Sequence, residues 1–572
     1  MIGRIFRRTL PFLWLIPGFL LWASFPPMGE KADVLFALAP LLWLSRRKDA
    51  RTSFWKWFQN GFFFWFATLA WMPAIVKNGG PWPLVVLGWG ALSAYCALYF
   101  AVFGWLVSRY WTWVRGNPLG TALERPRGYG WRLVGLVVVE PVLWAGLELL
   151  RSRLFGGFAW NQLGVAAVNA GLGAPVVLGG VYLASALVVL VNGTVASIAE
   201  RMLEPVVDRG RAPTFSVPRW ARSVETFLPI LLAWGVFKAA GPFVAPPAAE
   251  GSGNMRVAMI QRNFPSVFEQ GRDEDPLEVY AGLLSAVEHV KPRLVVLPES
   301  ALCEFGSVDS PRSAAFADWV REKTGASAVI AGGGRRSGGR EYNSAALYSQ
   351  APDSAAIALA AAVPQSRFPV PQIYDKVHLV PFGEYIPGDK LVTALQRLAP
   401  VGSCTAGELR LLDMDGAGIG VAICFEDTDS AQIRRLAEMG AQLLVFITND
   451  SWFSRSDEAV QHAWQSVARA IETGLPVARV GNSGVTGSVS PDGTATWLAD
   501  AEGRPLVDAA ATMCDMLTVI PRRRTPYVRL GDKPLAAAFA AVLAFVWFAA
   551  FRRRRRLMEG APYPKAEEGV VP

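Results

Sequence analysis

Hydrophobic residues are gathered in long runs over the first 245 residues and again near the C-terminus. About 20 apolar residues are needed to cross the hydrocarbon core of a bilayer, and eight stretches reach or approach this length with their flanks. They lie near residues 9–27, 33–45, 60–76, 82–107, 133–150, 174–198, 226–245 and 534–551. The pattern therefore predicts a polytopic α-helical membrane domain with eight transmembrane helices. Glycines and a proline between residues 171 and 180 predict a loop that leads into the sixth helix.

Between the seventh and eighth spans, short apolar runs alternate with amphipathic helical patterns. Strands are predicted at 255–261, 294–297, 328–331, 344–348, 418–424 and 443–448, and helices at 277–290, 313–324, 429–439 and 458–473. This alternation indicates an α/β fold. The expected divisions are a seven-helix transmembrane domain (1–246), an α/β domain (247–533), the eighth transmembrane helix (534–551) and a basic tail (552–572).

Basic residues are divided unevenly between the short loops. The N-terminus, the loops after the second, fourth and sixth spans, and Arg552–Arg556 at the start of the tail contain 23 Lys and Arg, whereas the other short loops contain four. Under the positive-inside rule, both termini are expected in the cytoplasm and the α/β domain on the opposite side. An uncleaved first span is expected rather than a signal peptide, because no small-x-small cleavage site follows the first run.

The composition agrees with a membrane protein and excludes several other classes. Hydrophobic residues make up 52% of the chain and charged residues 18%, which excludes a disordered chain. Of the 22 Trp, 17 precede residue 235, as is typical of rings at a membrane–water interface. The net charge of +9 is explained by the basic loops, so nucleic acid is not expected as a partner. Five Cys do not indicate a disulfide framework, and no metal-ligand spacing or phosphate-binding glycine loop predicts a metal or cofactor.

Three segments of the α/β domain place reactive side chains beside apolar strands. Glu299 follows Leu-Val-Val-Leu-Pro, Lys376 lies in the loop Tyr374–Pro387, and Cys424 ends a predicted strand. A carboxylate can accept a thiol proton, and an ammonium group favours both a thiolate and an oxyanion. Taken singly, the three residues are a solvated turn, a surface charge and a small core residue. Their combination indicates a nucleophilic site.

These segments resemble the nitrilase superfamily, whose enzymes carry a Glu-Lys-Cys triad on an α-β-β-α sandwich. The whole chain is similar to the apolipoprotein N-acyltransferase family, the polytopic membrane branch of that superfamily. Tyr374–Pro387 is the most specific segment. Supporting segments are Thr448–Phe453, Gln461-His462, Asn482–Thr486, Arg524–Arg529, Glu148-x-x-Arg151 and Phe155–Trp160.

The resemblance implies a role for each candidate residue. Glu299 is implied as general base, Lys376 as stabiliser of the tetrahedral oxyanion, and Cys424 as nucleophile. Other implied residues are two supporting carboxylates, Glu384 and Glu426, and three residues near a membrane entrance, Glu148, Arg151 and Trp160. A structural ion pair and an interfacial anchor are the alternative for these last three. His378 and His462 are expected to be structural hydrogen-bonding residues.

The resemblance also implies an enzyme of the bacterial inner membrane with a periplasmic catalytic domain. It would transfer an acyl chain from a phospholipid, through a cysteine thioester, to the α-amine of diacylglyceryl-cysteine in apolipoproteins. A monomer without cofactor is expected. A membrane-tethered amidase that hydrolyses a small amide is an alternative, because it would use the same triad. A transport or scaffold protein with an inactive insert is another, but the complete triad opposes it. Two positions depart from the family pattern: Phe425 stands where Tyr is usual, and Gln270 where an aromatic lid residue is expected.

Overall fold

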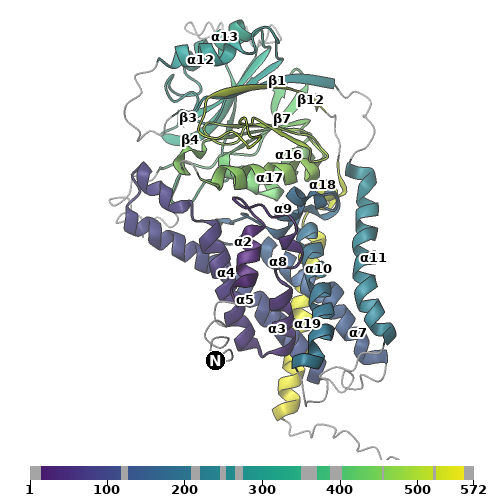
Figure 1. Cartoon of the computed structure of the whole chain (residues 1–572). Coiled ribbons are helices and arrows are strands. Elements are labelled where there is room, and N and C mark those ends of the chain that lie inside the picture. Colours follow the sequence, from purple (N-terminus) through teal and green to yellow (C-terminus); the bar gives the residue numbers. More distant parts are fainter. Residues whose placement is uncertain are drawn as a thin grey trace, which may run out of the picture.

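The computed structural model describes residues 14–116, 126–207, 219–244, 253–264, 275–349, 370–386, 402–453, 456–519 and 524–558. Gln270, Pro387, most of the predicted linker before residue 253 and the end of the basic tail lie outside these ranges. In the described ranges, an α/β domain rests on one end of a helical bundle (Figure 1). The bundle and the α/β domain are called the membrane half and the catalytic half below.

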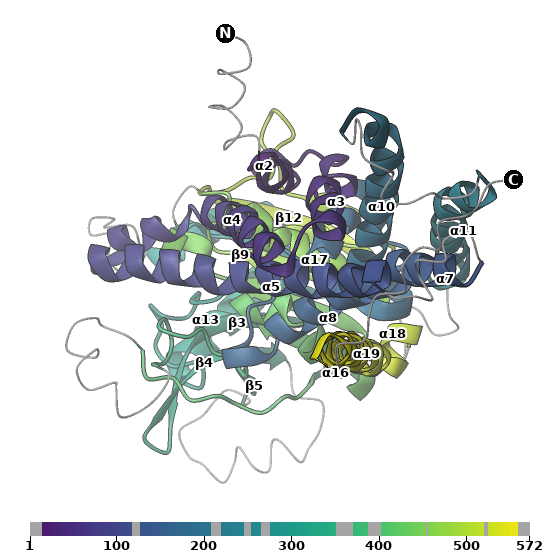
Figure 2. The ribbon, with the colours of Figure 1, turned by 90° about the horizontal axis from the view of Figure 1, so that it is seen from below.

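Helices of very different lengths form the membrane half. They are α2 (Ile16–Ala23), α3 (Ala39–Arg47), α4 (Ala50–Thr68), α5 (Trp82–Gly116), α7 (Pro126–Val134), α8 (Glu140–Arg151), α9 (Leu163–Ala167), α10 (Val176–Val207), α11 (Arg219–Val244) and α19 (Lys533–Met558). Seen from below, α5 runs across the bundle, with α2, α3 and α10 on one side and α19 on the other (Figure 2). The Asp49 side chain caps α4 by accepting from the N–H groups of Arg51 and Thr52. Arg51 and Lys56 therefore lie in a helix, not in the loop to which the sequence pattern assigned them.

Five helices in the described residues are long and apolar enough to cross a membrane. They are Trp82–Arg115, Gly130–Arg151, Val176–Met202, Arg222–Val244 and Lys533–Phe551. The spans expected at 9–27 and 33–45 contain the short helices α2 and α3, of eight and nine residues. The structure therefore has several candidate spans, and the exact number of eight stays a prediction.

The segment that precedes α10 is more helical than the sequence predicted. α9 and a π-helical turn at Val168–Leu172 lead into the expected loop, and only residues 173–175 separate that turn from the start of α10. Gly179 and Gly180 lie inside α10, where their backbone angles interrupt the helix. A Cβ atom on Gly180, whose φ is +68°, would lie 2.6 Å from the ring of Tyr527, so the aromatic ring can pack there only against glycine.

Two six-stranded mixed sheets form the centre of the catalytic half. Their strand orders are β12-β1-β2-β3-β4-β5 and β11-β10-β9-β8-β7-β6. The strands of the first sheet are β1 (Gly253–Gln261), β2 (Leu294–Val296), β3 (Ala328–Ser337), β4 (Arg340–Ser349), β5 (Gln372–Asp375) and β12 (Ala511–Val519). Those of the second are β6 (Leu412–Met414), β7 (Ala417–Ile423), β8 (Leu443–Thr448), β9 (Val477–Gly481), β10 (Gly487–Val489) and β11 (Ala495–Trp497).

Apolar side chains from both sheets fill the space between them, including Val257, Ile330, Val421 and Val445. α12 (Pro276–Ser285) and α13 (Pro311–Thr324) cover the outer face of the first sheet. α16 (Ser430–Met439) and α17 (Glu458–Thr473) cover the second sheet and face the bundle (Figure 1). The catalytic half is therefore an α-β-β-α sandwich, as the sequence predicted.

One hydrophobic core joins the two halves. Phe446 of β8 and Ile471 of α17 belong to the same buried cluster as Trp160 and Val181 of the membrane half. The interruption in α10 leaves the N–H of Val181 free to donate to the carboxylate of Glu472 in α17, at 2.7 Å. A short helix that follows β12, α18 (Pro526–Leu530), places Tyr527 against Gly180. The two halves are thus packed as one body.

Candidate active site

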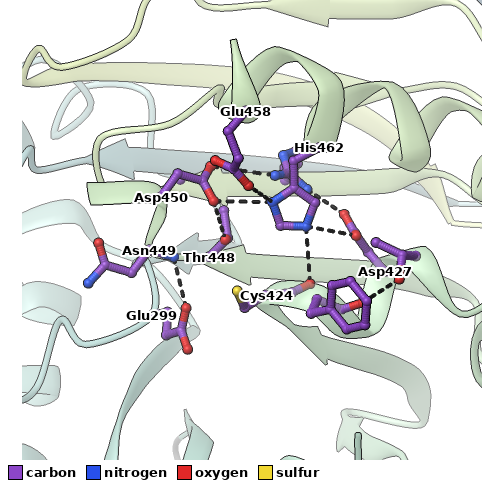
Figure 3. A network of polar contacts seen from close by, with 12 residues as sticks. Glu299, Cys424, Asp427, Thr448, Asn449, Asp450, Glu458 and His462 are labelled. Atoms are coloured by element: carbon purple, nitrogen blue, oxygen red, sulfur yellow. Dashed lines mark hydrogen bonds and ion pairs between the residues drawn. The ribbon is translucent and has the colours of Figure 1, made fainter. Parts of the chain in front are cut away.

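The structure brings Glu299, Lys376 and Cys424 together at one edge of the sandwich. Glu299 follows β2, Lys376 follows β5 and Cys424 follows β7. β2 and β5 run in the same direction in the first sheet, so the segments after them lie at the same edge. The N–H of Asn449, after β8 of the second sheet, donates to Glu299 at 2.8 Å and joins the two sheets there. Figure 3 shows Glu299 and Cys424 in this region.

Two hydrogen bonds fix the Glu299 carboxylate, which is 8% exposed. Its Oε1 accepts from Nδ2 of Asn343 at 2.7 Å, and its Oε2 accepts from the N–H of Asn449. Burial raises the pKa of Glu299 and the nearby charge of Glu384 raises it further, while Lys376 opposes the shift. The carboxylate therefore holds a proton more strongly than an ordinary Glu does, which suits a base that must accept one.

Lys376 is buried and forms an ion pair with Glu384. Its Nζ lies 3.0 Å from Oε1 and 2.9 Å from Oε2 of that carboxylate. Nδ2 of Asn343 also donates to Oε1 of Glu384, at 2.7 Å, so this amide links the two carboxylates of the site. Burial by itself lowers the pKa of Lys376, but the Cys424 thiolate, when it forms, and the charge of Glu384 raise it overall. Lys376 is therefore a fixed positive charge.

Cys424 begins a short 3-10 turn directly after β7. The strand ends at Ile423, one residue earlier than predicted. Its φ of +55° lies in the left-handed region, which non-glycine residues seldom occupy and which marks functional sites more often than ordinary turns. Burial raises the pKa of the thiol well above its usual value, Glu299 raises it further, and Lys376 lowers it. At neutral pH the thiol is protonated, so its reaction as a nucleophile needs a base.

Glu426 joins the turn after Cys424 to the loop that carries Lys376. The carboxylate is fully buried and accepts from the hydroxyl of Tyr374 and from the N–H groups of Val377, His378 and Ile423. Its distances to these donors lie between 2.7 and 3.0 Å. Glu426 thus fixes the two loops that carry the nucleophile and the lysine.

Glu148, Arg151 and Trp160 are buried beneath the catalytic half rather than exposed at an opening; they are 7%, 3% and 2% exposed. Arg151 donates to the carbonyl oxygens of Phe158 and Trp160 at 2.7 and 3.0 Å. Glu148 accepts from the N–H of Leu163 at 3.0 Å. Both side chains therefore hold the backbone of the segment that contains Trp160. Glu148 and Arg151 also line a narrow cavity between α4, α5 and α8 whose other walls are mainly aromatic.

Sequence analysis missed the residues that connect the reactive groups. Asn343 and Asn449 bind the carboxylates directly, and Asn449 lies in the segment Thr448–Phe453 that the resemblance had singled out. Asn343 directly precedes the buried run of β4, and a polar residue at such a position was the available signal. Contacts between the ends of two stacked sheets cannot be found from periodicity alone.

His462 is the centre of a buried charge network behind Cys424 (Figure 3). Its Nε2 lies 2.9 Å from Asp427 Oδ1 and 3.3 Å from the carbonyl oxygen of Cys424, and its Nδ1 lies 3.1 Å from Asp450 Oδ1. Both ring nitrogens thus face acceptors, and both carry protons to satisfy them. Burial by itself lowers the pKa of His462, but Asp427 and Asp450 raise it to about 10. The two aspartates favour the imidazolium form of His462, which makes hydrogen bonds here as expected.

Three residues of this network also have a geometry compatible with a metal ion, which the sequence spacing did not predict. Ligand atoms of Asp450, Glu458 and His462 all lie within 4.8 Å of one another. Arg479 pairs with Asp427 and lies 3.7 Å from Asp450, so Arg479 and the imidazolium already balance two aspartates. Burial and the charge of Asp450 raise the pKa of Glu458 well above normal, which favours its neutral form. The charges are matched without an added cation, and we interpret the group as an ion-pair network.

Comparison with known proteins places both halves. Residues 17–194 match the apolipoprotein N-acyltransferase N-terminal domain, and residues 256–519 match the carbon-nitrogen hydrolase family. An apolipoprotein N-acyltransferase of Geobacter metallireducens is 30% identical over 557 residues, which cover 94% of this chain and 95% of that protein. The chain belongs to the apolipoprotein N-acyltransferase family.

Other members of the apolipoprotein N-acyltransferase family match over nearly their whole length. The protein of Methylococcus capsulatus is 27% identical over 571 residues, covering 97% of this chain and 99% of its own. That of Vibrio vulnificus is 25% identical over 565 residues, covering 96% and 98%. Among solved structures, a mutant amidase from Nesterenkonia sp. AN1 aligns at 17% identity and a TM-score of 0.33, covering 51% of this chain and 99% of that chain. The catalytic half of this apolipoprotein N-acyltransferase family member has the nitrilase-like fold of carbon-nitrogen hydrolases.

Proposed function

We propose that this protein transfers a fatty acyl chain from a membrane phospholipid to the N-terminal α-amine of diacylglyceryl-cysteine in apolipoproteins. The observation that carries the proposal is the cluster of Glu299, Lys376 and Cys424 at an edge of the sandwich that adjoins the membrane half. Phe425, next to the nucleophile, packs on Phe158 of the membrane half with ring centroids 6.1 Å apart. A thiol nucleophile beside a membrane surface suits substrates that arrive by lateral diffusion in the bilayer.

In the first step, Glu299 accepts the proton of the Cys424 thiol as sulfur attacks the ester carbonyl of the phospholipid. The negative oxygen of the tetrahedral intermediate is stabilised by the fixed charge of Lys376. The carbon–oxygen ester bond then breaks, and the departing alkoxide takes the proton back from Glu299. A thioester on Cys424 and a lysophospholipid are the products.

In the second step, the α-amine of the lipoprotein attacks the thioester carbonyl. Glu299 accepts a proton from the attacking amine and returns it to the departing Cys424 thiolate, so the amide forms and the free thiol is restored. The pKa of Glu299, raised by burial, makes it effective in both directions of proton transfer. No cofactor is needed for either step.

Two further carboxylates are proposed to support this chemistry. Glu384 holds Lys376 by the ion pair described above. It also shares the amide of Asn343 with Glu299, so it fixes the position of the lysine relative to the proposed base. Glu426 keeps the lysine loop and the nucleophile turn together through its backbone contacts. Neither carboxylate is proposed as the base, because Glu384 is already bound by Lys376 and Glu426 accepts from several backbone donors.

We further propose a location in the bacterial inner membrane, with the catalytic half in the periplasm and both termini in the cytoplasm. Basic residues of several helices support this orientation. Arg46 of α3 pairs with Glu140 and its carbonyl oxygen accepts from Arg115 of α5, while Arg132 of α7 and Arg201 of α10 pair with Glu200 and Glu225. α3 and α7 lie at the end of the bundle away from the sheets (Figure 1). Cysteines introduced at Lys48 and Glu502 test it. A membrane-impermeant maleimide applied to intact spheroplasts is expected to label Glu502→Cys and not Lys48→Cys, and the reverse pattern would overturn the topology.

The decisive experiment is intact mass spectrometry of the purified protein after incubation with phospholipid. We expect a mass increase of one acyl chain in the wild-type protein and none in Cys424→Ser, because a serine hydroxyl is far less acidic than a thiol. Cys303→Ser is the matched control and is expected to keep the adduct. Loss of the adduct in Cys303→Ser, with retention in Cys424→Ser, would refute the assignment. Release of ammonia from a small amide, without transfer to an amine, would favour the amidase alternative.

A further inference from the structure

The residue after Cys424, Phe425, packs against two aromatic rings of the membrane half. The ring of Phe425 is stacked on Phe158 and on Trp160, with interplanar angles of 16° and 10°. Trp160 is 2% exposed, and its ring also lies over His462, with centroids 5.4 Å apart. Both rings belong to the segment whose backbone Arg151 holds. Trp160 therefore contacts both Phe425, the residue after Cys424, and His462, which contacts the carbonyl oxygen of Cys424.

A single amide of the catalytic half joins several segments of the membrane half. Gln461 of α17 is 1% exposed, and its Oε1 accepts from the indole N–H of Trp160 at 2.9 Å. Its other bonded groups are Nδ2 of Asn161, the indole N–H of Trp71, and the carbonyl oxygens of Pro26 and Thr68. Groups of the membrane half thus make all of these hydrogen bonds to the amide of Gln461. The position of this side chain therefore depends on how the two halves are docked.

The next residue of the same helix reaches the nucleophile. His462 contacts the carbonyl oxygen of Cys424 and the carboxylate of Asp427, three residues further along the turn. Because Gln461 and His462 are adjacent in α17, a displacement of Gln461 moves the imidazolium with it. The backbone of Cys424 is held at a positive φ, which the chain keeps only while its surroundings fix it.

We propose that Trp160 and Gln461 of the docking interface are positioning residues that hold Cys424 in its reactive geometry, through Phe425 on one side and His462 on the other. The membrane half is then a part of the catalytic apparatus, in addition to its role as anchor. This role differs from the membrane entrance expected from the sequence. An entrance residue affects how well a lipid binds, whereas a positioning residue affects how readily the thiol ionises and attacks.

A small water-soluble thiol reagent separates the two roles, because its reaction needs no lipid site. Iodoacetamide is applied to the full-length protein in detergent, and alkylation is followed at Cys424 and at exposed Cys303 by peptide mass spectrometry. Trp160→Phe keeps an aromatic ring at this position but removes the indole N–H that donates a hydrogen bond to Gln461. Gln461→Met keeps the length and removes the whole amide. We expect alkylation of Cys424 to slow about tenfold in each variant, the effect of one or two lost buried hydrogen bonds on the geometry of the thiol.

Trp111→Phe is the matched control. Trp111 is also buried in the membrane half and donates one hydrogen bond, to Glu140 at 2.9 Å, but it belongs to the opposite end of the bundle. We expect this variant to alkylate Cys424 at the wild-type rate. The rate at Cys303 is expected to be unchanged in all variants, which shows that the catalytic half remains folded.

Other outcomes would overturn the proposal. If Trp160→Phe and Gln461→Met alkylate at the wild-type rate but require more phospholipid for half-maximal acylation, the two residues belong to a lipid-binding site. An equal slowing in Trp111→Phe would mean that any loss of packing in the bundle has the same effect. Because iodoacetamide replaces the lipid, these results hold whether or not phospholipid is the acyl donor, so this proposal and the proposed function can fail separately.

Discussion

Two groups of buried charges, one at the end of the bundle away from the sheets and one where the sheets adjoin the bundle, differ in their balance. The arginine cluster, at the end of the bundle away from the sheets, pairs three arginines with three glutamates: Arg46, Arg132, Arg201, Glu140, Glu200 and Glu225. Arg46 donates to both carboxylate oxygens of Glu140, at 2.8 and 2.6 Å. The catalytic cluster places one ammonium group, that of Lys376, among the carboxylates of Glu299, Glu384 and Glu426.

The difference shows how a protein separates structural from reactive charges. In the arginine cluster every charge has an opposite partner, so the energy of each group is lowest in one fixed arrangement, which ties α3, α7, α8, α10 and α11 together. In the catalytic cluster carboxylates exceed cations. Burial is the main cause of the raised pKa values of Glu299 and of the Cys424 thiol; a neighbouring carboxylate adds to it in each case, and Lys376 opposes it. Burial beside unmatched negative charge leaves protons available for transfer in this cluster.

The largest expected effect tests the structural side of the comparison. Glu140→Gln leaves the buried guanidinium of Arg46 without its charged partner, and we expect a loss of about 3–5 kcal/mol in stability. Thermal unfolding in detergent measures the loss, and the rate of Cys424 alkylation in the folded protein should stay unchanged. Replacing both Arg46 and Glu140 by Met is the control, and it should cost much less because no unpaired charge remains. If Glu140→Gln kept its stability but alkylated Cys424 slowly, the arginine cluster would act on the reactive site and not on stability, and the distinction between the two clusters would be wrong.

The next effect concerns the single cation of the catalytic cluster. Lys376→Met should slow single-turnover acylation by a fluorescent phospholipid about 100-fold or more, a barrier of about 3 kcal/mol, because the proposed oxyanion loses its fixed positive charge. Higher pH should restore little of this rate. Glu299→Gln should also slow acylation, but higher pH should restore part of the rate of this variant, because hydroxide in solution then removes the thiol proton. Equal rescue of both variants would mean that Lys376 acts mainly on the thiol pKa, and the oxyanion role would be withdrawn.

Glu384→Gln tests whether the excess of negative charge sets the proton affinity of the base. The charge of Glu384 raises the pKa of Glu299, so removing it should lower that pKa. Acylation needs Glu299 ionised and falls as pH falls through its pKa. The acidic limb of the pH–rate profile should therefore move to lower pH in the variant, even if the maximal rate is reduced. An unmoved limb would show that burial alone raises the pKa of Glu299.

The smallest expected effect is at a partly exposed ion pair between the halves. Asp429 lies 3.1 Å from Arg153 and 3.6 Å from His378. Burial by itself raises the pKa of Asp429, but these partners lower it to about 2. The stabilisation is therefore present above the ordinary Asp pKa of 3.8 and is lost as pH falls toward 2. The part due to His378, whose pKa Asp429 raises, is lost as pH rises above its ordinary value of 6.5.

Asp429→Asn should therefore lower stability by less than about 1 kcal/mol near pH 6, since Arg153 is 37% exposed and such pairs are weak. Unfolding temperatures of the variant and the wild-type protein, measured from about pH 2 to pH 8, give the difference. The gap should narrow at both ends of this range. A loss comparable to that of Glu140→Gln would mean that exposure does not separate the two kinds of pair.

Elements with strong local patterns were predicted well. β8 is a continuous apolar run and α17 has a marked apolar face, and both were predicted to the residue at Leu443–Thr448 and Glu458–Thr473. β12 was missed, because its sequence Ala-Thr-Met-Cys-Asp-Met-Leu-Thr-Val is only partly apolar and its pairing with distant β1 defines it as a strand. The first spans were predicted too long, because apolar composition does not reveal where prolines and turns interrupt a helix.

The same distinction holds for the site. Residues with distinctive chemistry, such as Cys424 and Lys376, stand out in the sequence beside their strands. Asn343 and Asp427 do not, because their importance comes from neighbours on other strands and helices. The burial of Trp160 and Arg151 could not be read from the sequence either, since it depends on the docking of two halves that are far apart along the chain.

The last residues of the chain complete three separate gaps, and this has a consequence for the order of synthesis. β12 covers the edge of β1, Tyr527 fills the groove at Gly180, and Phe539 packs where a Cβ on Gly146 would lie 2.2 Å from its ring. A ribosome makes all three after the parts that they complete. Until this segment emerges, the nascent chain has an open strand edge and unfilled helix grooves. Products truncated before β12 would therefore be incomplete in both halves at once.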